Sequence, residues 1–239
     1  MAAYQRGDYA TALIFLRPLA EQGNPQAQYT LGYIYAEGES VPEDDGEAVR
    51  WYRKAAEQSD ADAQNELGVM YAAGRGVSKD DAEAVKWFRK AAEQGHAEAQ
   101  YNLGQMNREG WGVPQDDAEA VKWFRKAAAQ GDTDAQNELG VMYAAGRGVR
   151  QDYVEAVKWY RMAAVQGHIG AQTNLGLMYY IGEGVPQELA QAHMWYNIAD
   201  ALGGERAQEE RDIVASRMTR DQIFEAQRMA REWMAKHQQ

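Results

Sequence analysis

Hydrophobic positions recur along most of the chain with a fixed spacing of 36 residues. The dipeptide Ala-Gln begins at positions 27, 63, 99, 135 and 171, and Leu-Gly begins at positions 31, 67, 103, 139 and 175. Tryptophan keeps the same spacing, at Trp51, Trp87, Trp123, Trp159 and Trp195. A fixed period in this range is typical of arrays in which similar helical units stack on one another.

Each repeat contains the pattern of two helices. In the second repeat, the apolar residues Ala63, Leu67, Met70 and Tyr71 follow helical spacing, which predicts a first helix, helix A, over residues 61–73. Glycines at 74 and 76 end it, because glycine adopts a positive φ at low cost. A second helix, helix B, is expected over residues 79–94. No segment shows the strict alternation of a strand, so the sequence predicts an all-α protein.

Polar residues mark where these helices begin. One polar residue precedes each helix A, and an Asp-Asp pair precedes or opens helix B in the first three repeats. Asn and Asp are good N-caps, and acidic residues are favourable near a helix N-terminus. We therefore expect Asn24, Asp60, His96, Asp132 and His168 to cap or flank helix A, and the pairs at 44–45, 80–81 and 116–117 to cap helix B.

The repeat A-Q-x-x-L-G-x-x-Y-x-x-G-x-G-V, followed by A-V-x-W-Y/F-x-x-A-A-x-x-G, resembles the Sel-one-like repeat (SLR) family, a tetratricopeptide-like class. This resemblance implies a right-handed α-solenoid of stacked helix-turn-helix repeats. Five full repeats are expected at 24–59, 60–95, 96–131, 132–167 and 168–203. Residues 1–23 would form an N-terminal half repeat, and residues 204–239 would form C-terminal capping helices, the second of which opens with a capping box of Thr219 and Gln222.

Charge and cysteine content exclude several classes of function. The formal net charge is −11, which argues against nucleic-acid binding because phosphate contacts need concentrated Lys and Arg. The chain has no cysteine, which excludes disulfides, thiolate metal sites and cysteine nucleophiles. No apolar run is long enough to insert into a membrane. The compartment stays open between a cytoplasmic protein and an exported one whose signal peptide has been removed.

No arrangement of residues indicates catalysis. The four histidines lack metalloprotease spacing, no Gly-x-Ser-x-Gly motif occurs, and the glycine-rich loops lack the Lys-Ser/Thr of a phosphate-binding loop. The Asp pairs lie along one edge of the array instead of converging in a cleft. We therefore predict no catalytic residue, no metal and no cofactor, and we expect the periodic tryptophans to lie in the core.

The resemblance also implies that the A helices line a concave, peptide-binding surface. The helix A positions outside the conserved framework of the repeat are the candidates for contact with a partner. Asn and Gln can bond an extended peptide backbone, and Tyr offers flat contact area. The alternative is that these positions are merely solvated. The candidates are Tyr29, Tyr33, Asn65, Val69, Tyr101, Gln105, Arg108, Asn137, Val141, Thr173, Leu177 and Tyr180.

The third repeat departs most from the shared pattern. Asn107 replaces the tyrosine of the other repeats, Arg108 follows it, and Trp111 in the next loop lies off the tryptophan period. A part-buried Asn needs a hydrogen-bond partner, for which we expect Arg108 or a ligand. We therefore add Asn107 to the candidate site and Trp111 as a loop contact. Neutral drift within one repeat would explain the same departures.

Taken together, these patterns predict a non-enzymatic scaffold that binds a peptide or protein segment along the concave face. One alternative is a hydrolase of cell-wall or β-lactam-like substrates, an activity attributed to cysteine-rich relatives and disfavoured here by the absence of cysteine. The other is a self-associating structural protein, with either a monomer or a weakly associating one expected in solution. The sequence does not identify the partner.

Overall fold

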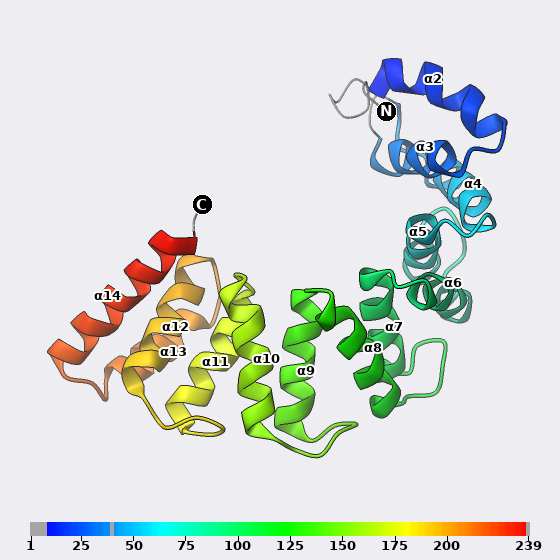
Figure 1. Ribbon diagram of the computed structural model, residues 1–239. Helices are drawn as coiled ribbons and strands as arrows, with labels where there is room; N and C mark the ends of the chain where they lie inside the picture. Colours follow the sequence, from blue (N-terminus) through cyan, green and yellow to red (C-terminus); the bar gives the residue numbers. More distant parts are fainter. Residues whose placement is uncertain (1–8, 39–40, 238–239) are drawn as a thin grey trace. The chain divides into compact units, whose positions relative to one another are not determined.

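The computed structural model describes residues 9–38 and 41–237 (Figure 1). Within these residues the chain forms thirteen helices and no strand, and consecutive helices pack as pairs. The fold is an all-α solenoid of two-helix repeats, as the sequence predicts. The chain divides into two compact units, Met1–Ala127 and Ala128–Gln239.

Helices A and B alternate along both units. The A helices are α3 (Pro25–Glu37), α5 (Ala61–Ala73), α7 (Ala97–Glu109), α9 (Thr133–Ala145) and α11 (Ile169–Ile181). The B helices are α4 (Asp45–Ala56), α6 (Asp81–Glu93), α8 (Asp117–Ala129), α10 (Tyr153–Val165) and α12 (Leu189–Ala201). Helix α2 (Tyr9–Glu21) precedes them, and α13 (Ala207–Ala215) and α14 (Arg220–His237) follow.

The predicted helix ends are largely confirmed, because local capping residues set them. Helix α5 has the predicted bounds, whereas α6 begins at Asp81, two residues later than expected, because Asp80 is its N-cap and accepts a hydrogen bond from the Glu83 N–H. Each helix A carries the expected cap, whose side chain accepts from the backbone N–H three residues on. These caps are Asn24, Asp60, His96, Asp132 and His168.

The repeated Ala-Gln dipeptide joins each helix A to the preceding helix B. Within the first unit, Gln64 Nε2 donates to the Ala56 carbonyl at the end of α4, at 3.0 Å, and Gln94 Nε2 donates to Gln64 Oε1 at 2.7 Å. Gln28 makes the same bond to the Ala20 carbonyl of α2 and Gln100 to the preceding helix B, and Gln136 and Gln172 make it in the second unit. These buried amides satisfy carbonyls that the helix ends leave without an intrahelical partner.

The repeated Leu-Gly dipeptide brings helices A and B of one repeat close together. A Cβ atom on Gly68 would lie 2.7 Å from the Phe88 ring, so any larger residue would push α5 and α6 apart. Leu67 beside it is fully buried. The periodic tryptophans are core residues, as expected: Trp51, Trp87, Trp123 and Trp195 are at most 8% exposed, and Trp159 is half-buried.

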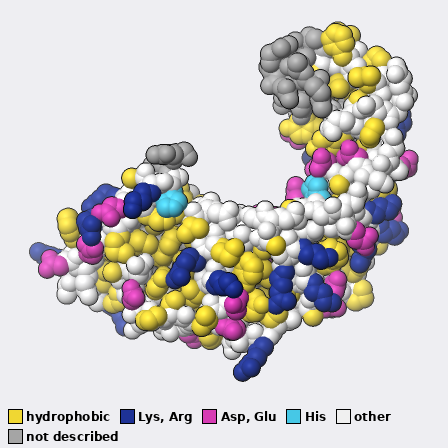
Figure 2. Space-filling model, viewed as in Figure 1, with side chains coloured by type: hydrophobic (Ala, Val, Ile, Leu, Met, Phe, Trp, Pro, Cys, Tyr) yellow, Lys and Arg dark blue, Asp and Glu magenta, His cyan; other side chains and the backbone are white. Residues whose placement is uncertain are grey.

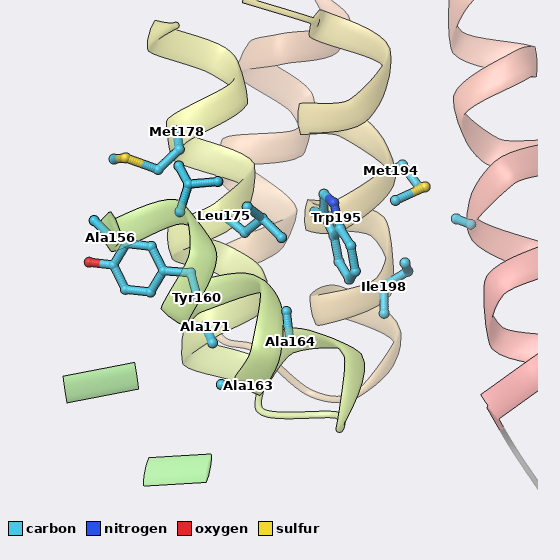
Figure 3. Packing of buried hydrophobic residues seen from close by; sticks show 12 residues of the cluster. Ala156, Tyr160, Ala163, Ala164, Ala171, Leu175, Met178, Met194, Trp195 and Ile198 are labelled. Carbon is cyan, nitrogen blue, oxygen red and sulfur yellow. The ribbon is translucent and has the colours of Figure 1, made fainter. Parts of the chain in front are cut away.

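The core of the second unit shows the same packing. Tyr160 of α10, Leu175 of α11 and Trp195 of α12 belong to one buried cluster (Figure 3). The C-terminal helices continue this core, because Trp233 of α14 packs edge-on against Trp195 with ring centroids 5.6 Å apart. The predicted capping box is confirmed: the Thr219 N–H donates to Gln222 Oε1 at 2.8 Å, and the Gln222 N–H donates to Thr219 Oγ1.

Part of the predicted N-terminal half repeat lies outside the described residues. Residues 1–8 of the expected 1–23 segment belong to that part, and α2 covers the rest. Ala12, Leu16 and Ala20 of α2 pack with Leu31 of α3 in one buried cluster. Among the helices described, none is both long and apolar enough to cross a membrane.

Candidate functional site

The first unit contains a pocket of about 430 Å³ between α5 and α7, beside the start of α6. Four of the predicted site residues line it, namely Val69, Tyr101, Gln105 and Trp111. The other lining residues were not predicted as site residues from the sequence; they are Ala72, Ala73, Lys79, Asp81, Phe88, Asn102 and Met106. Most of the lining is apolar, with the polar groups of Gln105, Asn102 and Asp81 at separate points. This combination is typical of a site that takes one side chain or small group.

Two helix A residues form a polar pair on the α7 wall of the pocket. Gln105 Nε2 donates to the Tyr101 hydroxyl at 2.8 Å, and the Tyr101 ring packs against Phe124 with centroids 5.8 Å apart. The other amide atom, Gln105 Oε1, is buried and accepts no hydrogen bond from the residues that the structure describes. A buried acceptor without a donor is unfavourable, so a ligand that supplies one would be stabilised here.

Trp111 occupies a position that is an arginine in the second repeat. There, Arg75 donates to both carboxylate oxygens of Asp45, at 2.8 and 3.2 Å, to the Ala36 carbonyl at 3.1 Å, and to Glu43. Trp111 cannot make these bonds, and its side chain is 54% exposed. The tether from this loop to the preceding repeat is therefore missing, and the pocket lies where it would be.

The backbone still holds this loop against α6. Gly112 has a φ of +68°, and a Cβ atom there would lie 2.2 Å from the Asp81 carbonyl oxygen. The close approach and the positive φ both require glycine. The backbone beside Trp111 is thus fixed near the first residue of α6, and Gly76 makes the same contact with Asp45 one repeat earlier.

Two carboxylates lie one helical turn before the pocket on its two walls. Glu66 precedes Val69 on α5, and Glu98 precedes Tyr101 on α7. Burial raises the pKa of Glu66, and the negative charge of Glu98 raises it further. Among the described residues, no Lys or Arg forms an ion pair with either carboxylate. These two carboxylates give the surface next to the pocket a negative local charge.

Asn107 is buried in α7. It is 4% exposed, and its Nδ2 donates to the Leu103 carbonyl of the same helix at 2.7 Å. The described partner of this amide is therefore the Leu103 carbonyl and not Arg108, because the side chain is short enough to reach back one turn along α7. Arg108 is instead bonded to Glu109 at 2.7 Å.

The Asn107 replacement also removes a tether between repeats. Arg17, Arg53 and Arg161 each donate to the hydroxyl of the tyrosine at the position equivalent to Asn107 in the next helix A. Arg89 is the equivalent arginine of α6, and it is exposed. The third repeat therefore lacks two contacts, those of Arg75 and of the tyrosine hydroxyl, that the second repeat makes to the repeat before it.

Predicted asparagines away from the pocket join the A helices to each other. Asn102 Nδ2 donates to Asn65 Oδ1 at 3.1 Å, and Asn65 itself is only 1% exposed. In the second unit Asn174 donates to Asn137 with the same geometry and distance. Asn65 and Asn137 therefore have a packing role that explains why this residue type recurs.

The remaining predicted site residues do not line the pocket. Tyr29 and Tyr33 of α3 are half-buried, and the Tyr29 ring packs against Tyr52. In the second unit Leu177 is 38% exposed, whereas Thr173 Oγ1 donates to the Ile169 carbonyl of its own helix. Val141 packs against the core, and Arg217, in the turn after α13, lies over the Tyr180 ring at 5.2 Å.

His96 and His168 each cap a helix A and bond to an aspartate of the preceding repeat. His96 Nδ1 accepts from the Ala99 N–H, so Nε2 carries the proton and donates to Asp62 Oδ1 of the preceding repeat at 3.1 Å. His168 and Asp134 repeat this arrangement in the second unit.

On the visible face in Figure 2, acidic and basic side chains are interspersed with hydrophobic ones.

A comparison between repeats could have found the missed pocket residues. The second and fourth repeats carry arginine at the position of Trp111, at Arg75 and Arg147, and the preceding repeat carries an acid at the equivalent positions Asp45, Asp81 and Asp117. Replacement of arginine by tryptophan at position 111 leaves Asp81 without its expected arginine. This pairing of an arginine with an acid one repeat earlier is the sequence signal for Asp81.

Comparison with known proteins gives the family. The model of the Sel1 repeat matches residues 25–60, 61–96, 97–132, 133–168 and 169–203. A Sel1 repeat protein from Oxalobacter formigenes is 39% identical, with a TM-score of 0.82 over 87% of this chain and 86% of that one. A sel1 repeat protein from Klebsiella pneumoniae is 26% identical, with a TM-score of 0.51 over 84% of this chain and 97% of that one.

A longer relative is also similar. The protective antigen of uropathogenic Escherichia coli strains, which displays an SLR fold, is 38% identical with a TM-score of 0.88. The match covers 94% of this chain and 48% of that chain, so this chain spans about half the length of that relative. No curated protein matches the chain. The five consecutive repeat matches show that the chain belongs to the Sel1 repeat family.

Proposed function

We propose that this chain is a non-enzymatic scaffold that binds a segment of a partner protein along its A helices, with the pocket beside Trp111 as the principal contact. Sel1 repeat proteins are generally interaction scaffolds. The observation that carries the proposal is the pocket itself, which gathers Val69, Tyr101, Gln105 and Trp111 from two repeats.

The surroundings of the pocket support a binding role over a packing role. Trp111 is half-exposed in a loop whose backbone Gly112 holds in place, so it offers a large apolar contact at little further cost in conformational entropy. Exposed aromatic residues in fixed positions are frequent energetic centres of protein interfaces. The third repeat lacks the contacts that Arg75 and the Tyr71 hydroxyl make in the second repeat, and it has this open, apolar pocket instead.

Capture of partners from extract of the native cells tests this proposal. Simultaneous replacement Tyr101→Ala and Trp111→Ala should remove at least 90% of the specifically captured partner, because it deletes both aromatic walls. Quantitative mass spectrometry measures the captured amount, and thermal unfolding shows whether the fold is retained.

Phe224→Ala is the matched control, because Phe224 is an exposed aromatic residue, 63% accessible, on the terminal helix α14. This variant should capture as much partner as the unaltered chain. Equal capture by the double variant and the control, with both proteins folded, would contradict the assignment of the pocket as the binding site.

A further inference from the structure

We infer that the pocket beside Trp111 binds an arginine side chain of the partner segment. This inference rests on the proposed scaffold function and specifies what the scaffold recognises. The chain itself contains the template, because the second repeat places its own guanidinium at the equivalent point. The pocket is that site with the internal arginine replaced by tryptophan.

The second repeat shows how the site holds a guanidinium. Arg75 places two nitrogen atoms on the Asp45 carboxylate, and one of them also reaches the Ala36 carbonyl at the C-terminal end of α3. A carboxylate with a planar fork of donors is the strongest common ion-pair geometry. The C-terminal end of a helix adds a partial negative charge. These acceptors together favour arginine over an uncharged group.

Where the third repeat meets the second, the acceptors are kept and the donor is missing. Asp81 is equivalent to Asp45, and Ala72 is equivalent to Ala36, and both line the pocket. No described residue donates to the Ala72 carbonyl. In the second unit, by contrast, Gln151 donates to the equivalent Ala144 carbonyl at 2.8 Å, and Gln187 donates to the Tyr180 carbonyl. The carbonyls of Ala36, Ala144 and Tyr180 each accept a side-chain hydrogen bond, whereas that of Ala72 accepts none from the described residues.

The shape of the pocket suits the rest of an arginine side chain. Its apolar wall, which includes Val69 and Ala73, can cover the three methylene groups, and the Trp111 indole offers a flat face to the guanidinium. The buried Gln105 Oε1 provides one further acceptor. Lysine would use the charge of this site but not its planar arrangement of acceptors.

The local charge also favours a cation. Among the described residues that line the pocket, Lys79 alone is basic, and its Nζ lies 3.6 Å from Asp81 Oδ1 with a side chain that is 64% exposed. Such an exposed, long ion pair is weak and can be displaced. Glu66 and Glu98 lie one turn away and form no ion pair with a described Lys or Arg. In the first repeat the position equivalent to Lys79 is Glu43, which accepts from Arg75.

Titration with N-acetyl-arginine amide tests the inference on the full chain. The probe should produce a saturable shift of the Trp111 indole N–H signal in ¹H–¹⁵N spectra, and Trp111→Phe assigns that signal by its loss. N-acetyl-citrulline amide, which has nearly the same shape without the charge, should bind at least about tenfold more weakly. Equal binding of the two amides would overturn the inference.

Variants of the pocket refine the test. Asp81→Asn should weaken binding of the arginine probe about tenfold, because it removes the charge from the main acceptor. Lys79→Glu should tighten binding, since it restores the acid found at Glu43. Trp111→Arg, followed through the backbone amide signals of Tyr101 and Gln105 because the indole is lost, should abolish binding by refilling the site from within. Asp45→Asn is the matched control at the equivalent acid of the first repeat and should leave the affinity for the probe unchanged.

The outcomes separate this inference from the scaffold function. If the double variant at Tyr101 and Trp111 loses its partner but the arginine probe shows no preference over citrulline, the scaffold stands and the arginine site is wrong. If the probe binds as expected but capture does not depend on the pocket, the scaffold assignment is wrong and the arginine site stands. Unchanged probe binding in both Asp81→Asn and Trp111→Arg would also overturn the arginine site.

Discussion

His193 stands where the other B helices carry valine, at Val49, Val85, Val121 and Val157. Its side chain is 2% exposed, and Nδ1 has no hydrogen-bond partner among the described residues. Burial lowers the pKa of His193 below its ordinary value of 6.5. The nearby Arg211 of α13 lowers it further, while Asp212 acts in the opposite direction. The neutral form is therefore the one that the fold accommodates.

We expect His193→Val to stabilise the protein and to reduce its sensitivity to acid. In the unaltered chain the unfolded state binds a proton more readily than the folded state, so the free energy of unfolding falls as the pH drops below about 6.5. Valine removes this contribution and the unpaired nitrogen, which should add about 1 kcal/mol at neutral pH. Urea unfolding between pH 5 and pH 8 measures both effects.

The exposed terminal histidine provides the control for this prediction. His237→Gln replaces an exposed histidine that stacks on Trp233 near the end of α14, far in the chain from the buried position of His193. A His193→Val protein with the same pH slope as the unaltered chain would show that His193 is not responsible for it.

At the scale of the element, His96 both begins α7 and joins it to the preceding repeat. His96→Ala removes the cap on the Ala99 N–H and the hydrogen bond to Asp62, and should cost about 1–2 kcal/mol of unfolding free energy. His96→Asn keeps a side-chain acceptor for the cap but is too short for the bond to Asp62. It should therefore cost clearly less.

Chemical denaturation of both variants, with Asp62→Ala as a third, separates the two contributions. Equal losses for His96→Ala and His96→Asn would show that the cap adds nothing measurable. An unchanged stability in Asp62→Ala, which removes the acceptor of the His96 bond, would place the whole effect on the cap.

The ends of the helices could be predicted from the sequence because their causes are local. A cap such as Asp60 lies within three residues of the N–H group it bonds, and the residues between them are visible in the sequence. The predicted start of α6, residue 79, is two residues too early, because the sequence pattern does not distinguish the extended N-cap Asp80 from the first residues of the helix. The recurring Ala-Gln and Leu-Gly dipeptides likewise predicted which residues lie in the core.

The pocket could be predicted only in part because its cause is not local. Trp111, Tyr101, Gln105 and Val69 were predicted from the sequence, whereas Asp81 was interpreted only as part of a helix cap and Ala72 was not predicted. The partner of Asn107 was also wrong, since the sequence does not show whether an amide turns towards its own helix or away from it. Such questions depend on distances between repeats that a single sequence does not contain.

At the scale of the whole molecule, each repeat contacts mainly its neighbours in sequence. A destabilising substitution at one end should therefore lower the stability of the nearby helices and not of distant ones. Trp233→Ala removes the ring that covers Trp195 at the C-terminal end, and should cost about 2 kcal/mol. Hydrogen exchange should accelerate in α11, α12 and α14 while the amides of α3 to α7 keep their rates.

Phe224→Ala on the same helix is the control, because Phe224 is exposed and its loss should change stability by less than about 0.5 kcal/mol. Faster exchange throughout α3 to α7 in the Trp233→Ala protein would contradict the expectation that the array responds locally. It would indicate that the chain unfolds as one cooperative block.

The His–Asp bonds restrict how repeats of this chain can be rearranged by recombination or by design. Asp62 of the second repeat meets His96 of the third, and Asp134 of the fourth meets His168 of the fifth. Two copies of the second repeat placed in succession would bring Asp60 of one copy towards Asp62 of the other, and would set two carboxylates where a bond had been. A repeat that begins with histidine is therefore best kept directly after one that carries this aspartate, so the second and third repeats, and the fourth and fifth, should be moved together.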